Sequence, residues 1–312
     1  MASKRLDPDV DGVRDGVTQR LLGPAEIREI AGRLGVRPSK RLGQNFVVDP
    51  GTVRRIITLA ELDPGDVVLE VGPGFGSLTL GLLAAARRVV AVEVDPVLAA
   101  ELPRTVAAKA PDLAPRLTVV TADAARVTPA GISAAAGITD LPGRPTAPGD
   151  EPSVLVANLP YNVATPLVVR MLEEVPAITR MLVMVQAEVG DRLAAVAGSP
   201  AYGAVSVVVA WWASATVVGH VPATVFVPRP KVASALVAIE RHPTGTGYAR
   251  FKEVVRAGFG QRRKMLRRSL DGVVEPGAFE AAGVNADARA EELDVEQWVR
   301  LAAWTPNAPT PS

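Results

Sequence analysis

Short runs of β-branched residues alternate with longer helical segments along most of this 312-residue chain. Parallel strands need long crossover connections, so the alternation predicts a doubly wound, Rossmann-like α/β fold with a mostly parallel, seven-stranded sheet. Segment 202–213 is rich in valine and tryptophan, yet we expect a helix there because the crossover to the next strand needs one. The segments predicted as strands are 66–71, 88–95, 116–123, 153–160, 180–186, 215–221 and 234–241.

Changes in composition along the chain indicate its domain organisation. Residues 1–23 are polar and charged, and we expect them to form a mobile N-terminal extension. The predicted sheet occupies 24–242, interrupted at 129–152 by a Pro/Gly-rich insertion that we expect to be flexible. Beyond the sheet the pattern turns helical and basic, which predicts a small helical domain over 243–304, followed by a disordered tail at 305–312.

The composition argues against several classes of protein. There is no cysteine and only two histidines, so we expect no disulfide, no metal site and no His-based catalytic triad. No apolar run reaches about 18 residues and no signal peptide is visible, which predicts a cytoplasmic protein without membrane association. The net charge is only +1, yet residues 229–268 hold eleven basic and two acidic side chains. Such an asymmetry indicates a polyanionic partner.

A glycine-rich turn, LEVGPGFGS, joins the first predicted strand to a helix. Gly72 and Gly74 let the backbone approach a ligand, and Glu93 ends the next strand, where a carboxylate can bind ribose hydroxyls. Either a dinucleotide or S-adenosylmethionine fits this pattern, and the acid Glu70 before the turn favours S-adenosylmethionine. Asp123 ends the third strand, where it contacts the adenine amino group or only caps a helix.

Asn158, Leu159, Pro160 and Tyr161 end the fourth predicted strand at the same edge of the sheet. An exocyclic base amine is a poor nucleophile because its lone pair is delocalised into the ring. The Asn158 amide oxygen and the Leu159 carbonyl can accept its two N–H groups and localise that lone pair, while Pro160 keeps Leu159 extended. Tyr161 can stack on the base. These residues therefore predict methyl transfer to a base amine by alignment, although a plain turn would also explain them.

Together these motifs resemble the rRNA adenine N6-dimethyltransferase family, and within it the branch that acts on small-subunit (16S) rRNA. The resemblance implies S-adenosylmethionine as cofactor and N6,N6-dimethylation of two adjacent adenosines near the 3′ end of 16S rRNA. It also implies action on the 30S subunit or its precursor, as part of ribosome biogenesis, and we expect a monomer. The matching segments, in chain order, are GQNFVVDP, LEVGPGFGSLT, VEVD, TADA, NLPYNVATPL, QAEVGDRL, YGAVSV, VFVPRPKVASALV, FGQRRKMLRRSL and ARAEEL.

The same resemblance implies which residues bind the cofactor. Asn45 and the backbone at Val47 would contact its methionine part, although the family usually has leucine in place of Val47. Gly72 would line the pocket, Glu93 would bind the ribose and Asp123 the adenine. The Gly74 backbone belongs to the same turn.

For the target base, the resemblance implies that Asn158 meets both the cofactor and the amine. Tyr161 and Phe226 would stack on the two faces of the target adenine. Without the resemblance, Phe226 would be interpreted as an ordinary core aromatic.

The basic segment FGQRRKMLRRSL is predicted as an amphipathic helix with Phe259, Leu266 and Leu270 on its apolar face. A run of charges is often only a solvated face. Beside a site for a base amine, however, it predicts contact with RNA phosphates. The predicted RNA-binding residues are Arg262, Arg263, Lys264, Arg267 and Arg268.

Three alternatives remain open from the sequence. The nearest is the related large-subunit (23S) rRNA adenine methyltransferase of the macrolide-resistance type. A second is an assembly factor whose binding matters more than its catalysis. The weakest is a nicotinamide-dependent oxidoreductase, for which the sequence offers no catalytic residue.

Overall fold

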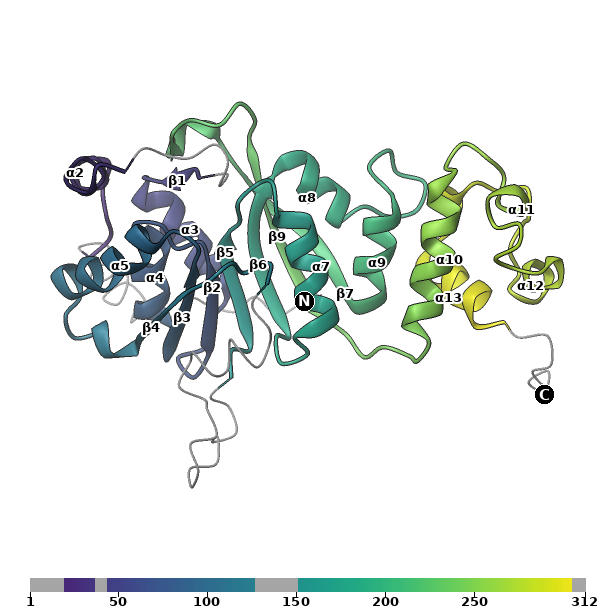
Figure 1. Ribbon diagram of the computed structural model, residues 1–312, viewed down its shortest axis with the longest axis horizontal. Coiled ribbons are helices and arrows are strands. Elements are labelled where there is room, and N and C mark those ends of the chain that lie inside the picture. The colour runs from purple at the N-terminus through teal and green to yellow at the C-terminus, as the bar shows by residue number, and fades with distance from the viewer. Residues whose placement is uncertain (1–19, 37–43, 127–150, 305–312) are drawn as a thin grey trace, which may run out of the picture.

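A seven-stranded sheet forms the centre of the computed structural model, which describes residues 20–36, 44–126 and 151–304 (Figure 1). Only β9 runs antiparallel to its neighbours, so the predicted mostly parallel Rossmann-like sheet is confirmed with all seven strands. The strands in spatial order are β4 (Leu117–Thr121), β3 (Arg88–Glu93), β2 (Val67–Val71), β5 (Val154–Asn158), β6 (Arg180–Gln186), β9 (Ser234–Arg241) and β7 (Ala213–Val221).

Helices cover both faces of the sheet and bury alternate strand side chains (Figure 1). Val68 and Val156 point into one core, whereas Leu69 and Leu155 point into the other. The first face is covered by α2 (Pro24–Leu34), α3 (Pro50–Ala60), α4 (Ser77–Ala85) and α5 (Pro96–Lys109). The second is covered by α7 (Ala164–Glu174), α8 (Ala187–Leu193) and α9 (Ala204–Trp212). The short turns η1 (Ala114–Arg116) and η2 (Ala223–Val225) precede β4 and β8.

Local chemistry explains where the helices start. Asp49 and Asp95 are the N-caps of α3 and α5, and each side chain accepts hydrogen bonds from backbone N–H groups of the first turn. Both helices have proline at the first position, where a missing N–H costs nothing. The valine-rich α9 is a helix as predicted, because β6 and β7 run in the same direction and need a crossover.

The order of the strands creates a crevice at the carboxyl edge of the sheet. After β2 the chain proceeds outward through β3 and β4, whereas β5 and β6 lie on the other side of β2. Ligands of open α/β sheets bind at this kind of reversal. A two-stranded antiparallel sheet, β1 (Phe46–Val47) with β8 (Phe226–Val227), supplies further residues beside the crevice.

Four helices and a short turn follow the sheet and form the C-terminal unit: α10 (Tyr248–Gly260), α11 (Leu266–Ser269), α12 (Pro276–Ala281), η3 (Ala290–Glu292) and α13 (Val295–Ala303). They lie at the end of the molecule beyond α9 (Figure 1). Their core surrounds the buried Trp298 and also includes Tyr202, Val207 and Trp211 from the α9 region. The C-terminal unit is therefore packed on the sheet domain through a shared core.

The predicted continuous basic helix is wrong, because α10 ends at Gly260 and α11 begins only at Leu266. Between them the backbone turns, and Leu266 N–H donates to the Ala288 carbonyl instead of a helical partner. Glycine at the break weakens helix continuation. Of the predicted apolar face, Leu266 and Leu270 have no exposed surface and Phe259 is partly buried against the same core.

The predicted N-terminal extension also needs a correction. Leu21 and Leu22 belong to the core, so residues 20–23 are part of the fold. The rest of that extension, most of the predicted insertion at 129–152 and the predicted tail lie outside the described residues. Within the described ranges, no helix is long and apolar enough to cross a membrane, and no three His, Cys, Asp or Glu side chains are grouped to hold a metal ion.

Candidate active site

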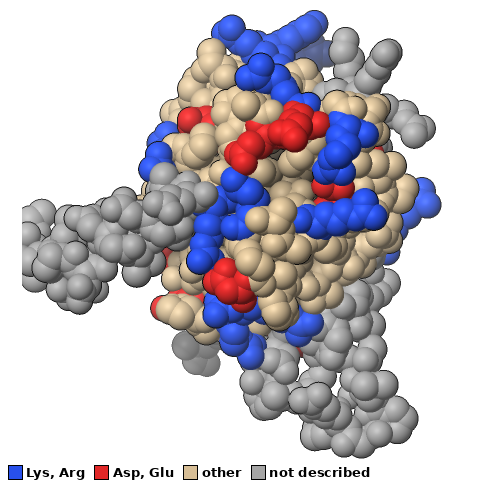
Figure 2. All heavy atoms as spheres, turned by 90° about the vertical axis from the view of Figure 1, so that its left-hand side faces the viewer, with Lys and Arg blue, Asp and Glu red and all other residues tan. Residues whose placement is uncertain are grey.

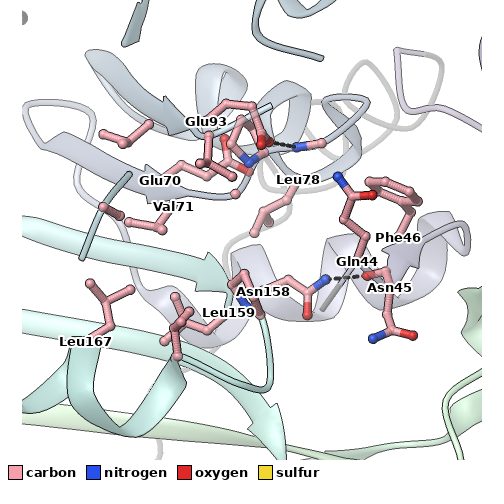
Figure 3. A pocket seen from close by; sticks show the side chains of 18 of the residues that line it. Gln44, Asn45, Phe46, Glu70, Val71, Leu78, Glu93, Asn158, Leu159 and Leu167 are labelled. Atoms are coloured by element: carbon pink, nitrogen blue, oxygen red, sulfur yellow. Dashed lines mark hydrogen bonds between the residues drawn. The ribbon is translucent and has the colours of Figure 1, made fainter. Parts of the chain in front are cut away.

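A cavity of about 260 Å³ opens at the carboxyl ends of β2, β3, β4 and β5 (Figure 3). It lies at the reversal of strand order, where a ligand site is expected. The glycine turn, Asn45, Val47 and the segment from Asn158 to Tyr161 all line it, together with Glu93 and Asp123. The structure thus brings together every predicted site residue of the sheet domain except Phe226.

The glycine turn holds its backbone against the cavity in a conformation that other residues rarely adopt. Gly72 and Gly74 have φ angles of 69° and 58°. A Cβ atom on Gly74 would lie 2.7 Å from the Phe46 ring, so a side chain there would displace part of the cavity wall. A Cβ on Gly72 would meet Pro160 at an ordinary 3.8 Å, so there the φ angle is the main constraint.

Two buried carboxyl groups, Glu70 and Glu93, lie side by side near this turn (Figure 3). Glu70 accepts a 2.6 Å hydrogen bond from the Thr79 hydroxyl. Burial, together with the nearby Glu93 charge, raises the pKa of Glu70 to about 8. Glu93 accepts backbone hydrogen bonds from Gly74 at 3.1 Å and Asp95 at 3.0 Å. Burial also raises the pKa of Glu93, which those two bonds partly oppose.

Asp123 lines the cavity at the end of β4 with its side chain 47% exposed. It accepts a hydrogen bond from Ala125 N–H at 2.9 Å and lies 3.6 Å from the Arg126 guanidinium. The local hydrogen bond fits the alternative in which Asp123 only caps a turn. Because Asp123 also lines the cavity, its contact with adenine stays a prediction.

Asn158 is fixed by a contact from the other side of the cavity. Its amide nitrogen donates a 2.8 Å hydrogen bond to the backbone carbonyl of Asn45 (Figure 3). This bond commits the N–H end of the amide to the protein, so the oxygen on the opposite branch remains the end that can act as an acceptor. The Asn45 backbone therefore orients the amide that the sequence singled out.

The residues after Asn158 are held by the ends of neighbouring strands. Leu159 N–H donates to the Met184 carbonyl of β6 at 3.0 Å, which continues the sheet by one residue. Tyr161 is half-buried, and its hydroxyl shares a 2.8 Å hydrogen bond with the Ser234 hydroxyl at the start of β9. Burial raises the pKa of Tyr161, so its phenol is neutral near pH 7.

Phe226 is the predicted site residue that does not line the cavity. It belongs to β8, pairs with Val47 and is only 2% exposed within the core of the α3–α4 face. This position is that of a core aromatic, the interpretation that Phe226 would receive without the resemblance. Its stacking on a target base stays a prediction that requires Phe226 to be uncovered.

The predicted RNA-binding residues are all exposed, around the turn between α10 and α11. Arg262 forms an ion pair with Glu291 at 2.7 Å, and Arg267 forms one with Asp287 at 3.0 Å. The other three form no ion pair with any residue in the described ranges. We call this set the C-terminal basic surface: Arg262, Arg263, Lys264, Arg267 and Arg268.

Several lining residues were missed from the sequence. Gln44 and Phe46 flank Asn45 in the segment before α3, while Phe75 lies within the glycine turn and Leu78 in the first turn of α4. Phe46 packs on Phe75 with ring centroids 4.5 Å apart, which closes one side of the cavity. Their position inside two matched motifs was the available signal, but apolar side chains beside a functional one are usually assigned to the core.

The residues of the cavity fit S-adenosylmethionine, the cofactor that this fold implies. Buried carboxyl groups of Glu70 and Glu93 line the cavity and offer acceptors for ribose hydroxyls or an amino group, and the absence of a Cβ on Gly74 lets the glycine turn lie close against the Phe46 ring. Fold and site together define an S-adenosylmethionine-dependent methyltransferase. A sequence model of the family described as ribosomal RNA adenine dimethylase matches residues 36–306. The chain therefore belongs to the ribosomal RNA adenine dimethylase family.

Similar proteins agree with this assignment. The chain is 51% identical over 293 residues to ribosomal RNA small subunit methyltransferase A of Leifsonia xyli, covering 91% of this chain and 98% of that protein. It is 48% identical to the protein of that name from Thermobifida fusca, over 94% and 99% of the two chains. Among solved structures, the 23S rRNA methyltransferase ErmE is 28% identical with a TM-score of 0.59, over 82% and 98% of the chains. A dimethyladenosine transferase from Plasmodium falciparum has a TM-score of 0.65 at 23% identity, over 81% and 94%, which shows the shared fold.

Proposed function

We propose that this protein transfers methyl groups from S-adenosylmethionine to N6 of two adjacent adenosines near the 3′ end of 16S rRNA. The observation that carries the chemistry is the Asn158 amide, held by the Asn45 carbonyl at the carboxyl end of β5 beside Tyr161. The substrate is suggested by relatives of 48–51% identity, which are named as small-subunit methyltransferases. The 23S methyltransferase ErmE is more distant at 28% identity, which disfavours the large-subunit alternative.

The geometry addresses the weak nucleophilicity of the adenine amine. The Asn158 amide oxygen and the Leu159 backbone carbonyl would accept the two N6 hydrogens, which localises the nitrogen lone pair. When bound, S-adenosylmethionine supplies a methyl group made electrophilic by its sulfonium. Because the Leu159 backbone is tied to Met184 and the Asn158 amide to Asn45, both acceptors are preorganised, so little reorganisation is needed in the transition state.

The remaining steps need no dedicated base. Once a methyl group is on N6, the nitrogen is acidic enough to release its proton to water. Tyr161 would stack on the target base and hold it out of its RNA helix. The apolar wall of Phe46, Phe75 and Leu78 would exclude water from the reacting atoms.

We assign RNA contact to the C-terminal basic surface. Arg263, Lys264 and Arg268 are exposed and form no ion pair with described residues, so their charge is available to phosphates. Glu291, which pairs with Arg262, also accepts a backbone hydrogen bond from Gly198 in the α8–α9 segment. Since α8 starts directly after the carboxyl end of β6, the basic surface is linked to the edge of the sheet that carries the cavity.

The opposite end of the molecule has a different charge pattern. Figure 2 shows basic and acidic side chains adjoining on the α2–α5 end. Ion pairs join the two helices there, including Lys109 with Glu26 at 2.6 Å and Arg33 with Glu101. Such mutual neutralisation disfavours this end as the main phosphate-binding surface.

We further propose that the substrate is the 16S rRNA within the 30S subunit or its precursor, and that the protein acts as a monomer in the cytoplasm during ribosome biogenesis. The Asn158 and Tyr161 side chains at the cavity favour catalysis over a purely binding role in assembly.

Methyl transfer from labelled S-adenosylmethionine to unmethylated small subunits, followed by nucleoside mass spectrometry, tests this function. We expect dimethyladenosine at two neighbouring positions of 16S rRNA. Asn158→Ala should lower the rate at least about 100-fold, the typical effect of removing one preorganised polar group at a reacting centre. Labelling of large-subunit rRNA alone would assign the protein to the 23S branch, and cofactor binding without labelling would leave the fold right and the substrate wrong.

A further inference from the structure

The Tyr161 hydroxyl has a defined partner outside the cavity. Its oxygen lies 2.8 Å from the Ser234 hydroxyl, 73 residues further along the chain. Ser234 does not line the cavity and has no exposed surface. The contact therefore holds the tyrosine by its hydroxyl end, from a residue that lies outside the cavity.

Ser234 is one of the most firmly held residues of the molecule. As the first residue of β9 it is paired with Gln186 of β6 on one side and with Val221 of β7 on the other. Tyr161, in contrast, lies in the turn between β5 and α7, where no strand holds its backbone. The hydrogen bond thus connects the ring of a turn residue to the rigid sheet.

Dimethylation makes two unequal demands on the site. In the first transfer, N6 carries two hydrogens, and both the Asn158 oxygen and the Leu159 carbonyl can accept one. After that transfer N6 carries one methyl group and one hydrogen, so only one of these two hydrogen bonds can form. In the second transfer the base is therefore held more by stacking on Tyr161 and less by hydrogen bonds.

We propose that Ser234 is a positioning residue that fixes the ring of Tyr161 and is needed more for the second methyl transfer than for the first. In that second step the N6 lone pair forms the bond to the methyl carbon. The carbon–sulfur bond breaks with its electron pair going to sulfur, and N6 releases its last proton to water. Each step consumes one S-adenosylmethionine. This inference rests on the proposed function and extends it to the order of the products.

The test follows monomethyladenosine and dimethyladenosine over time on unmethylated small subunits with Ser234→Ala. We expect the second transfer to slow about five-fold more than the first, the rate equivalent of one neutral hydrogen bond, so that monomethyladenosine accumulates. Ser234→Thr keeps the hydroxyl and should restore the wild-type product ratio. Ser206→Ala is the matched control, because it also removes a buried serine hydroxyl, which donates from α9 to the Arg192 carbonyl of α8 at 2.6 Å.

Tyr161→Phe removes the same hydrogen bond while it leaves Ser234 and β9 intact, so it tests the inference even if Ser234→Ala does not fold. It should give the same accumulation, and the double variant should add nothing further. An unchanged product ratio in both single variants, or equal accumulation in Ser206→Ala, would overturn the role of Ser234. Failure of the wild-type protein to form dimethyladenosine would instead overturn the proposed function itself.

Discussion

The cavity and the C-terminal basic surface hold their polar groups in different ways. In the cavity, Asn158 donates to Asn45 at 2.8 Å in a part-buried hydrogen bond, and Glu70 accepts from Thr79 at 2.6 Å in a fully buried one. On the basic surface the side chains are exposed, and the ion pairs of Arg262 and Arg267 remain open to water. Buried hydrogen bonds are costly to break, whereas exposed ion pairs contribute about 0–1 kcal/mol.

The difference matches the two tasks that we propose. Methyl transfer needs reacting atoms aligned closely, so each polar group must have one position. Phosphate binding needs only charge near a flexible backbone, so several mobile cations can share the work. Single substitutions should therefore have large effects in the cavity and small, additive effects on the basic surface.

The largest expected effect concerns Glu70, whose pKa is raised by burial to about 8, from 4.5. Between these pH values the folded protein binds more protons at this carboxyl than the unfolded chain does. The free energy of unfolding should therefore fall as the pH rises, by up to about 1.4 kcal/mol per pH unit. The protonated Glu70 carboxyl contributes its full stabilisation only below the pKa that this group has in the unfolded chain. Glu70→Gln resembles the protonated carboxyl, so it should flatten this slope in urea unfolding measured between about pH 5 and about pH 8.

The control for Glu70 is Glu280→Gln, which changes an exposed carboxyl on α12 that forms no ion pair with a described residue. It should leave the slope of the wild type in place. If Glu70→Gln left the slope unchanged, Glu70 would be ionised in the folded protein throughout this pH range. The contrast between the cavity and the basic surface would then lose its main support.

The next largest effect is expected for Gly74→Ala. Its φ of 58° costs a non-glycine residue about 1–2 kcal/mol, and the new Cβ would lie 2.7 Å from the Phe46 ring. We expect lower stability in thermal unfolding and at least about a ten-fold loss of S-adenosylmethionine affinity by calorimetry, because Phe46 lines the cavity. Gly65→Ala is the matched control, since a Cβ there meets nothing within 4 Å. If Gly74→Ala bound S-adenosylmethionine with wild-type affinity, the Phe46 ring would be able to move aside without loss of cofactor binding.

Much of the sheet could be predicted from the sequence, because each strand has a local residue pattern that is typical of strands. Runs such as VVLEV are buried along their whole length, which is typical of central parallel strands. Topology also predicted the helical state of the valine-rich α9. The chain needs a crossover connection there, and this requirement outweighed the high β-propensity of the residues. The break after Gly260 was missed, because backbone bonds to residues 286–288 replace the helical ones and come from outside the local window.

The site was predictable where a motif and a strand end coincide, as at Asn158 and Glu93. Contacts between distant segments were not predictable, and Tyr161 with Ser234 is the clearest case. The number of basic residues in 229–268 also does not show which of their side chains face solvent. Arg241 belongs to that count, yet its side chain turns inward and donates to the Ile178 and Leu172 carbonyls around the end of α7.

A triple substitution on the basic surface should have an intermediate effect. Replacing Arg263, Lys264 and Arg268 by alanine removes three exposed charges, so we expect the KM for small subunits to rise about ten-fold with kcat unchanged. The dependence of log KM on log salt should become shallower by about two to three, near one per lost phosphate contact. The matched control replaces three exposed arginines of the α2–α5 end: Arg28, Arg104 and Arg116. Equal changes in both triple variants would indicate general electrostatic attraction and not a defined surface.

The smallest effect, and the one of opposite sign, is expected for Glu291→Gln. In the cavity, removal of a hydrogen-bond partner should impair the protein. Glu291, however, pairs with Arg262 in an exposed ion pair, whose loss should cost the free energy of unfolding at most about 1 kcal/mol.

Loss of this carboxylate also frees the Arg262 guanidinium for phosphate, so the KM for small subunits should fall up to about two-fold at low salt and return to the wild-type value at high salt. Glu280→Gln makes the same charge change away from the basic surface and should leave KM unchanged. If Glu291→Gln instead raised KM, the Arg262–Glu291 pair would be holding the guanidinium in a binding position. The basic surface would then be preorganised in the way the cavity is, and the contrast between the two regions would be one of degree only.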